Sequence, residues 1–160
     1  MDHGYRVLVV AERIGEQLKL PPDELERLRV GAFLHDIGKF RLPYEIALKT
    51  SHLTEHEMGI MQKHSALGAE IVKVFRPDLS VAVLHHHENY DGSGYPLGLK
   101  GDAIDPLARI FRVADSYDAA EHDRHYHVGM FGGDVLKSIV DLSGHWYDPR
   151  VVDALMKVFC

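Results

Sequence analysis

Apolar side chains along this chain recur at steps of three and four residues, the spacing that places them on one face of an α-helix. The first such face is formed by Val7, Val10, Ala11, Ile14 and Leu18. Alternating apolar and polar residues, the pattern of a half-buried strand, nowhere continue long enough to build a sheet. The sequence therefore predicts an all-α protein of roughly six to eight helices.

Start and stop signals divide the pattern into separate helices. Prolines at 21–22 interrupt it, and Asp23 is expected to cap a second helix that ends near the dipeptide His35-Asp36. Thr54 and Glu57 form a capping-box pattern for a helix that is expected to end at His64. The remaining expected helices cover residues 65–75, 79–87, 103–121, 134–144 and 148–159.

Composition and charge restrict the functions open to the chain. Its 160 residues provide for one domain, so a single domain over residues 1–160 is expected. A net charge of −6 disfavours the broad basic surface that binds duplex nucleic acid. No apolar run approaches the length of a membrane span. Cys160 is the only cysteine, so an internal disulfide is impossible and a cytoplasmic location is expected.

Histidine is the unusual component, with 12 residues spread through the chain. Imidazole nitrogens and carboxylate oxygens suit iron, manganese or zinc. The two oxygens of Asp36 could bridge two ions, as in sites that clamp the attacking and leaving oxygens of a phosphoryl displacement. The candidate ligands are His3, His35, Asp36, His64, His86, His87 and Asp115. A lone histidine is more often a surface or hydrogen-bonded core residue, and we keep that interpretation for His52, His56, His122 and His145.

Three consecutive histidines, His85 to His87, precede the loop sequence "ENYDGSGYP". Successive helical residues are rotated by roughly 100°, so His85 and His87 would point about 200° apart on a continuous helix. Two neighbouring ligands and one bystander are therefore expected, and helix geometry does not decide which pair binds. In the loop, Gly92 and Gly94 would adopt backbone conformations closed to other residues.

Several motifs occur in one order along nearly the whole chain. They are "HGYRV" (3–7), "LHDIGK" (34–39), His64 with "GAEI" (68–71), "HHExxDGSGYP" (86–96), "LKG" (99–101) and "ARIFRVADSYDA" (108–119). In this combination the chain resembles the HD-GYP domain, a bacterial branch of the HD phosphohydrolase superfamily. The resemblance implies an HD-domain helical bundle of about five core helices with accessory C-terminal helices. It assigns residues 1–160 to a single HD-GYP domain.

The resemblance also implies an activity and a metal site. Family members hydrolyse cyclic di-GMP to pGpG, GMP or both at a bi- or trinuclear iron or manganese centre, by attack of a hydroxide held between the ions. One ion would be held by His3, His35, Asp36 and Asp115, and the other by Asp36, His64, His86 and His87. The glutamate that binds a third ion in some members would precede Met1, so two divalent ions are implied for this chain.

Substrate contacts are implied at three positions in the first hundred residues. Lys39 resembles the lysine that faces the nucleophile and the phosphate, and Gly94 and Tyr95 resemble residues that meet the ligand. The alternative for Lys39 is a solvated cation at a helix end, where the helix dipole is negative. The alternative for Gly94 and Tyr95 is a packed structural turn.

The segment "DRHYHV" (123–128) departs from the family pattern. Arg124 would hold a phosphate through two hydrogen bonds, or is a surface residue. His125 replaces a proline and His127 replaces a basic residue, which leaves the choice of dinucleotide open. The alternatives are an HD phosphohydrolase for another cyclic dinucleotide or nucleotide, and a non-catalytic module that binds cyclic di-GMP or docks a partner. The resemblance implies a diguanylate cyclase or an upstream sensor or receiver domain as that partner.

Overall fold

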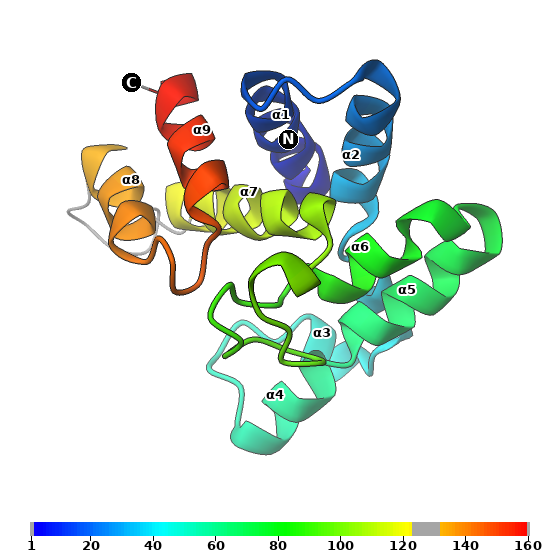
Figure 1. Ribbon diagram of the computed structural model, residues 1–160. Helices are drawn as coiled ribbons and strands as arrows, with labels where there is room; N and C mark the ends of the chain where they lie inside the picture. The colour runs from blue at the N-terminus through cyan, green and yellow to red at the C-terminus, as the bar shows by residue number, and fades with distance from the viewer. Residues whose placement is uncertain (1, 123–131, 160) are drawn as a thin grey trace.

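The computed structural model describes residues 2–122 and 132–159, which form a bundle of helices (Figure 1). The α-helices are α1 (His3–Gln17), α2 (Pro22–Leu34), α3 (Tyr44–Ala47), α4 (Glu55–Met61), α5 (His64–Phe75), α6 (Ser80–His85), α7 (Pro106–His122), α8 (Gly132–Asp141) and α9 (Pro149–Phe159). Three 3₁₀ segments join them, η1 (Ile37–Arg41), η2 (Pro77–Leu79) and η3 (Gly101–Ala103). The described residues contain no strand, and none of their helices has the length and apolar character of a membrane span. The all-α prediction is confirmed.

The core lies where α1, α2 and α7 pack together, with α7 running across the middle of the bundle (Figure 1). The apolar face predicted for α1 is confirmed, because Val7, Ala11 and Ile14 are fully buried. Phe111 of α7 is also fully buried, and its ring packs against Gly31 of α2 because that residue has no side chain. Burying each large apolar side chain stabilises the fold by about 1.5–3 kcal/mol. This core therefore fixes the relative positions of the helices whose ends carry the polar residues described below.

The helices α5 and α6 pack on each other, and α5 also packs on η1. The contact between α5 and η1 is unusually close, since a Cβ added to Gly68 would lie 3.2 Å from the backbone nitrogen of Gly38. Only glycine permits two backbones to approach in this way. The contact joins the segment after α2 to the beginning of α5.

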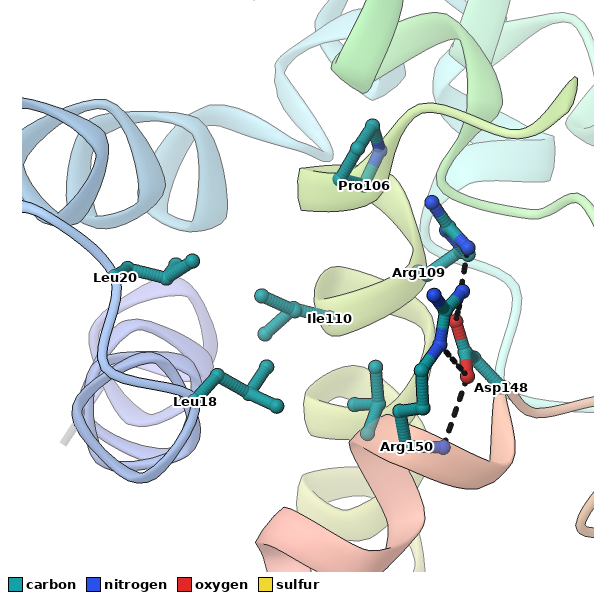
Figure 2. A pocket seen from close by; sticks show the side chains of 8 residues that line it. Leu18, Leu20, Pro106, Arg109, Ile110, Asp148 and Arg150 are labelled. Carbon is teal, nitrogen blue, oxygen red and sulfur yellow. Dashed lines mark hydrogen bonds and ion pairs between the residues drawn. The ribbon is translucent and has the colours of Figure 1, made fainter. Parts of the chain in front are cut away.

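The C-terminal helices are attached to α7 by a network of arginine and aspartate. Asp148, which is buried just before α9, accepts hydrogen bonds from Arg109 Nη1 at 2.9 Å and from Arg150 Nη2 at 2.8 Å. Figure 2 shows these side chains beside a hollow of about 320 Å³ that is also lined by Leu18 and Ile110. Because the buried carboxylate is fully paired, the start of α9 is held against α7.

Several helix boundaries differ from the sequence prediction, and both α6, at His85, and α8, at Asp141, end earlier than predicted. Asp23 is not the cap of α2, which begins at Pro22; proline suits the first helical position because its missing N–H would have no intrahelical partner there. The capping box of Thr54 and Glu57 is confirmed, but its helix ends at Met61 and His64 begins α5. No glycine or proline lies between the two helices, so the sequence contains no stop signal at this point.

Candidate metal centre

The candidate ligands come from the ends of several helices and from the middle of α7. His3 begins α1, and His35 and Asp36 follow α2. His64 begins α5, the pair His86-His87 follows α6, and Asp115 lies within α7. The core packing brings these helix ends to one place, so ligands that are far apart in sequence meet in space.

Asp36 lies at the centre of this group, and its two carboxylate oxygens face different histidines. Oδ1 lies 3.3 Å from His64 Nε2 and 3.9 Å from His86 Nε2. Oδ2 lies 3.5 Å from His35 Nε2 and 3.7 Å from His3 Nε2. One carboxylate therefore stands between two sets of ring nitrogens, as a bridging ligand would.

The two sets are compact enough for metal ions. Each has its ligand atoms within 4.8 Å of one another; the first is Asp36, His64, His86 and His87, and the second is His3, His35 and Asp36. Asp115 adjoins the second set, since its Oδ1 lies 3.2 Å from His3 Nε2 and 3.8 Å from His35 Nε2. All seven candidate ligands of the sequence analysis are thus brought together.

Backbone carbonyls orient three of the histidine rings. Each ring donates from Nδ1 to the carbonyl three residues earlier: His35 to Ala32 at 2.7 Å, His64 to Met61 at 2.7 Å and His86 to Val83 at 2.6 Å. These carbonyls lie at the C-terminal ends of α2, α4 and α6, where intrahelical partners are lacking. A carbonyl can only accept, so the proton is on Nδ1 and the lone pair of Nε2 points toward Asp36.

Asp118 orients His3 in the same manner from α7. Its carboxylate lies 2.8 Å from His3 Nδ1 and accepts a hydrogen bond from Arg6 Nε at 2.7 Å. Asp118 was not among the candidate residues predicted from the sequence. The available signal was its spacing, because a residue three positions after Asp115 lies on the same side of α7.

Two buried polar atoms at this centre have no hydrogen-bond partner in the described part of the chain, His35 Nε2 and Asp36 Oδ1. In addition, His64 Nε2 and His86 Nε2 face each other at 3.1 Å, although both nitrogens carry lone pairs. Buried polar atoms are nearly always satisfied, and a bound cation would satisfy unpaired acceptors that converge on one point. The residues therefore fit divalent metal ions.

The electrostatic environment gives several of these side chains, but not His3, the deprotonated state that a metal ligand needs. Burial lowers the pKa of His87 to about 3 and also lowers the pKa of fully buried His86. Burial acts to raise the pKa of Asp36, but the neighbouring His64 and other nearby positive charge hold this pKa well below its usual range. A hydrogen bond with Asp115 raises the pKa of His3 to about 9 against the effect of burial. Metal binding would displace the proton from His3.

The structure separates the three consecutive histidines. The helix α6 ends at His85, so the helical rotation no longer limits where the next two rings point. The rings of His86 and His87 lie together, 4.1 Å apart, at the centre. His85 faces elsewhere and accepts a hydrogen bond from the backbone N–H of Asp105 at 3.3 Å.

The glycine loop is built around a buried carboxylate. Glu88 accepts hydrogen bonds from the backbone N–H groups of Leu97, at 2.7 Å, and Leu99, at 2.9 Å. Gly92 has the expected positive φ of 91°. Gly94 is required for a different reason, because an added Cβ would collide with the backbone of residues 87–89. Glu88 was quoted in the motif but given no role in the sequence analysis, although its position beside the histidine pair was a usable signal.

The same loop lies directly over one set of ligands. The Tyr95 ring stacks on the His87 ring, with centroids 4.8 Å apart, and burial raises the pKa of Tyr95. Arg112 of α7 donates to Asn89 Oδ1 at 3.1 Å and stacks on Trp146, 5.5 Å from the ring centroid. The loop is therefore held between the metal centre and the segment before α9.

We predict that Glu88→Gln loosens this loop without removing metal ligands. A glutamine oxygen can accept one of the two backbone N–H groups, while its NH₂ group faces the other donor, at a cost of about 1–3 kcal/mol. The amides of Leu97 and Leu99 should then exchange hydrogen about 5- to 150-fold faster. Glu16→Gln, at an exposed position of α1, is the matched control. Unchanged exchange at both amides would show that Glu88 does not order the loop.

Lys39 lies beside the bridging position, with Nζ 2.6 Å from Asp36 Oδ2 and about two-fifths of its side chain exposed (41%). It is thus near the predicted reaction site while still able to meet a ligand from solvent. Arg124, His125 and His127 lie outside the described residues.

Comparison with known proteins agrees with this geometry. The profile described as "HD domain" matches residues 2–151. The chain belongs to the HD-domain family. The chain superimposes on a protein of Bdellovibrio bacteriovorus described as "a HDG"Y"P protein", with a TM-score of 0.77 and 24% identity, over 98% of this chain and 51% of that one. The predicted HD-domain bundle is confirmed.

Two curated relatives are similar to nearly the whole chain and are named for different cyclic dinucleotides. The cyclic di-GMP phosphodiesterase response regulator RpfG of Xanthomonas campestris is 39% identical over 95% of this chain and 41% of its own length. The 3′3′-cGAMP-specific phosphodiesterase 2 of Vibrio cholerae is 32% identical over 97% of this chain and 30% of its own length. The chain spans less than half the length of these relatives.

Proposed function

We propose that this chain is an HD-GYP domain and a metal-dependent phosphodiesterase that hydrolyses cyclic di-GMP to pGpG, GMP or both, with two divalent ions, iron or manganese. The observation that carries the proposal is the Asp36 carboxylate, whose oxygens face two separate sets of ring nitrogens. A carboxylate between two cations suits a displacement at phosphorus, in which charge develops on oxygens at both ends of the reacting bond. The names of relatives at 35–39% identity support the substrate.

The ligand assignment follows from which oxygen of Asp36 each histidine faces. The set around Oδ2 would be His3, His35, Asp36 and Asp115, and the set around Oδ1 would be Asp36, His64, His86 and His87. Mixed nitrogen and oxygen ligands without thiolate agree with iron or manganese.

Bound divalent ions would supply Lewis-acid activation of water and of the phosphoryl oxygens. The side chains of this chain would position the ions and the substrate. Asp36 would fix the distance between the two ligand sets. The Lys39 ammonium lies 2.6 Å from Asp36 Oδ2 and can contact a phosphate bound there. Gly94 and Tyr95 would form the side of the binding site above His87, and Arg124 would bind the second phosphate.

A second substrate, 3′3′-cGAMP, is the alternative that an observation favours. Relatives named as specific for it are 31–37% identical over nearly the whole chain. The two substrates differ in one purine base and share the reacting phosphodiester, so the metal centre would serve either. Discrimination would then depend on side chains that meet the bases.

We further propose that residues 1–160 act as one cytoplasmic domain, regulated by a sensor or receiver domain or by a diguanylate cyclase. The chain matches only part of each relative named above, which agrees with a regulatory unit elsewhere. A binding module without turnover is less favoured, because all seven candidate ligands lie in one cluster.

Protein purified without oxygen should contain about two iron or manganese ions per chain and should convert cyclic di-GMP to linear products. Elemental analysis measures the metal, and chromatography with mass spectrometry identifies products from cyclic di-GMP and 3′3′-cGAMP on the same sample. A chelated sample is the control and should regain activity when metal is restored. Fully loaded protein that leaves both dinucleotides intact would contradict the proposal, whereas hydrolysis of 3′3′-cGAMP alone would establish the second substrate.

A further inference from the structure

Large apolar side chains are exposed on the segment that follows the HD dipeptide. Phe40 of η1 is 91% exposed, Tyr44 at the start of α3 is 75% exposed, and Leu48 just after α3 is 59% exposed. An exposed aromatic ring does not stabilise the folded state by burial of apolar surface. Clusters of exposed apolar side chains commonly mark a binding site. The fold of the described residues gives no reason for this cluster.

The cluster is continuous with the candidate metal centre. Phe40, Tyr44 and Leu48 line a hollow of about 490 Å³ whose other walls include Asp36 and Lys39. Phe40 also lines a second hollow of about 380 Å³, together with His3 and Asp36. Both hollows therefore open onto the bridging carboxylate, and Phe40 contributes to each.

The combination of groups restricts what this surface can bind. Lys39 offers a positive charge beside Asp36, and Phe40 of η1 and Tyr44 of α3 line the same hollow. A ligand that fits must carry an anionic group and a flat apolar group a short distance apart. Nucleobases stack on exposed aromatic side chains without needing specific hydrogen bonds. A volume of this size is within the range of small-molecule sites.

We propose that Phe40 and Tyr44 form a stacking surface for one purine base of the cyclic dinucleotide, while the scissile phosphate lies at Asp36 and Lys39. This inference rests on the proposed function and extends it to residues that hold the substrate. The aromatic surface binds substrate and transition state alike, so it acts on the Michaelis constant rather than on the chemical step.

Substitutions at the two rings test the stacking surface. Phe40→Ala and Tyr44→Ala should each raise KM for cyclic di-GMP about 5- to 100-fold and leave kcat and metal content little changed. Phe40→Tyr, which keeps a ring, should restore KM. Phe75→Ala removes another half-exposed ring, at the far end of α5 from His64, and should leave KM unchanged.

Equilibrium binding supplies a measurement that does not depend on turnover. Titration with a slowly hydrolysed phosphorothioate analogue of cyclic di-GMP should show the same weakening in Phe40→Ala as the KM does. Wild-type protein that hydrolyses the dinucleotide, with KM and affinity unaffected by Phe40→Ala and Tyr44→Ala, would contradict the proposed stacking surface. It would leave the proposed phosphodiesterase activity supported. If wild-type protein binds the analogue without turnover, the proposed function fails while the binding comparison still tests the rings.

A different occupant of the same surface gives a different result. If the cluster were covered by a second copy of this chain, Phe40→Ala and Tyr44→Ala would change the sedimentation coefficient and leave KM and affinity for the analogue unchanged. That outcome would overturn the inference. Absence of binding and of turnover in metal-loaded wild-type protein would overturn both the inference and the proposed function.

Discussion

Asp36→Ala is expected to abolish metal binding and phosphodiesterase activity together. Asp36 is the one residue shared by both candidate ligand sets, with Oδ1 facing His64 and Oδ2 facing His35. Its removal takes a ligand from each ion and leaves the two groups of histidines facing each other without the anion between them. Bound metal contributes several kcal/mol to stabilising the transition state, so activity should fall on the order of 10³-fold or more.

The measurement pairs metal content with turnover in Asp36→Ala and in a matched variant. Asp153→Ala removes an exposed carboxylate from α9, outside the centre, and should keep about two ions per chain and full activity. Asp36→Asn keeps the shape of the side chain without its charge and should resemble Asp36→Ala. Two ions and wild-type activity in Asp36→Ala would contradict the bridging role, and loss of only one ion would place Asp36 in a single set.

The sequence was informative about the fold because its helical periodicity is strong and its capping signals are local. The buried face of α1 and the capping box before α4 both depend on residues within a few positions of one another, and both are confirmed. The boundary at His64 was predicted wrongly because the break between α4 and α5 involves no glycine or proline. What separates those helices is the packing of α5 on η1, a contact that local sequence does not show.

At the candidate site, sequence and resemblance identified the residues, and the structure supplied their relations. The spacing of residues could not indicate that Oδ1 and Oδ2 of Asp36 face different histidines. Asp36 and His86 are separated by 50 positions and meet only because the core packs their helices together. The carbonyls that orient His35, His64 and His86 belong to frayed helix ends, whose positions are the least predictable part of a sequence pattern. The exposure of Phe40 likewise depends on tertiary structure, because a phenylalanine is ordinarily expected to be buried.

The second large effect is expected at Gly38, which couples the HD segment to α5. A Cβ added at Gly38 would collide with the carbonyl oxygen of His64 and would lie 2.5 Å from the backbone nitrogen of Gly68. Neither obstacle is a flexible side chain, so Gly38→Ala must move η1 and α5 apart. Overpacking of this kind costs about 1–3 kcal/mol, and contact with rigid backbone places Gly38→Ala near the upper end of that range.

The consequence for the metal centre follows from which residues move. His64 belongs to α5 and Asp36 immediately precedes η1, so separating the two elements lengthens the 3.3 Å distance between Asp36 Oδ1 and His64 Nε2. The ligand set that contains His64 should therefore lose affinity for metal more than the set around His3 and His35. Urea unfolding in the presence of a chelator measures the loss of stability alone, because metal binding to the folded state then makes no contribution; titration with Mn²⁺ afterwards measures the two sites.

Gly59→Ala provides the matched control for Gly38→Ala. Gly59 lies within α4, and an added Cβ there would meet no atom within 4 Å. Alanine in a helix interior is more stable than glycine by roughly 0.5–1 kcal/mol, so Gly59→Ala should unfold at an equal or higher urea concentration with both metal sites intact. If Gly38→Ala were as stable as Gly59→Ala and bound two Mn²⁺ ions with wild-type affinity, the close contact of η1 with α5 would not control the geometry of the centre. Lower stability and weaker Mn²⁺ binding in Gly38→Ala would show that this glycine, which has no ligand atom, sets the distance between the Asp36 carboxylate and His64.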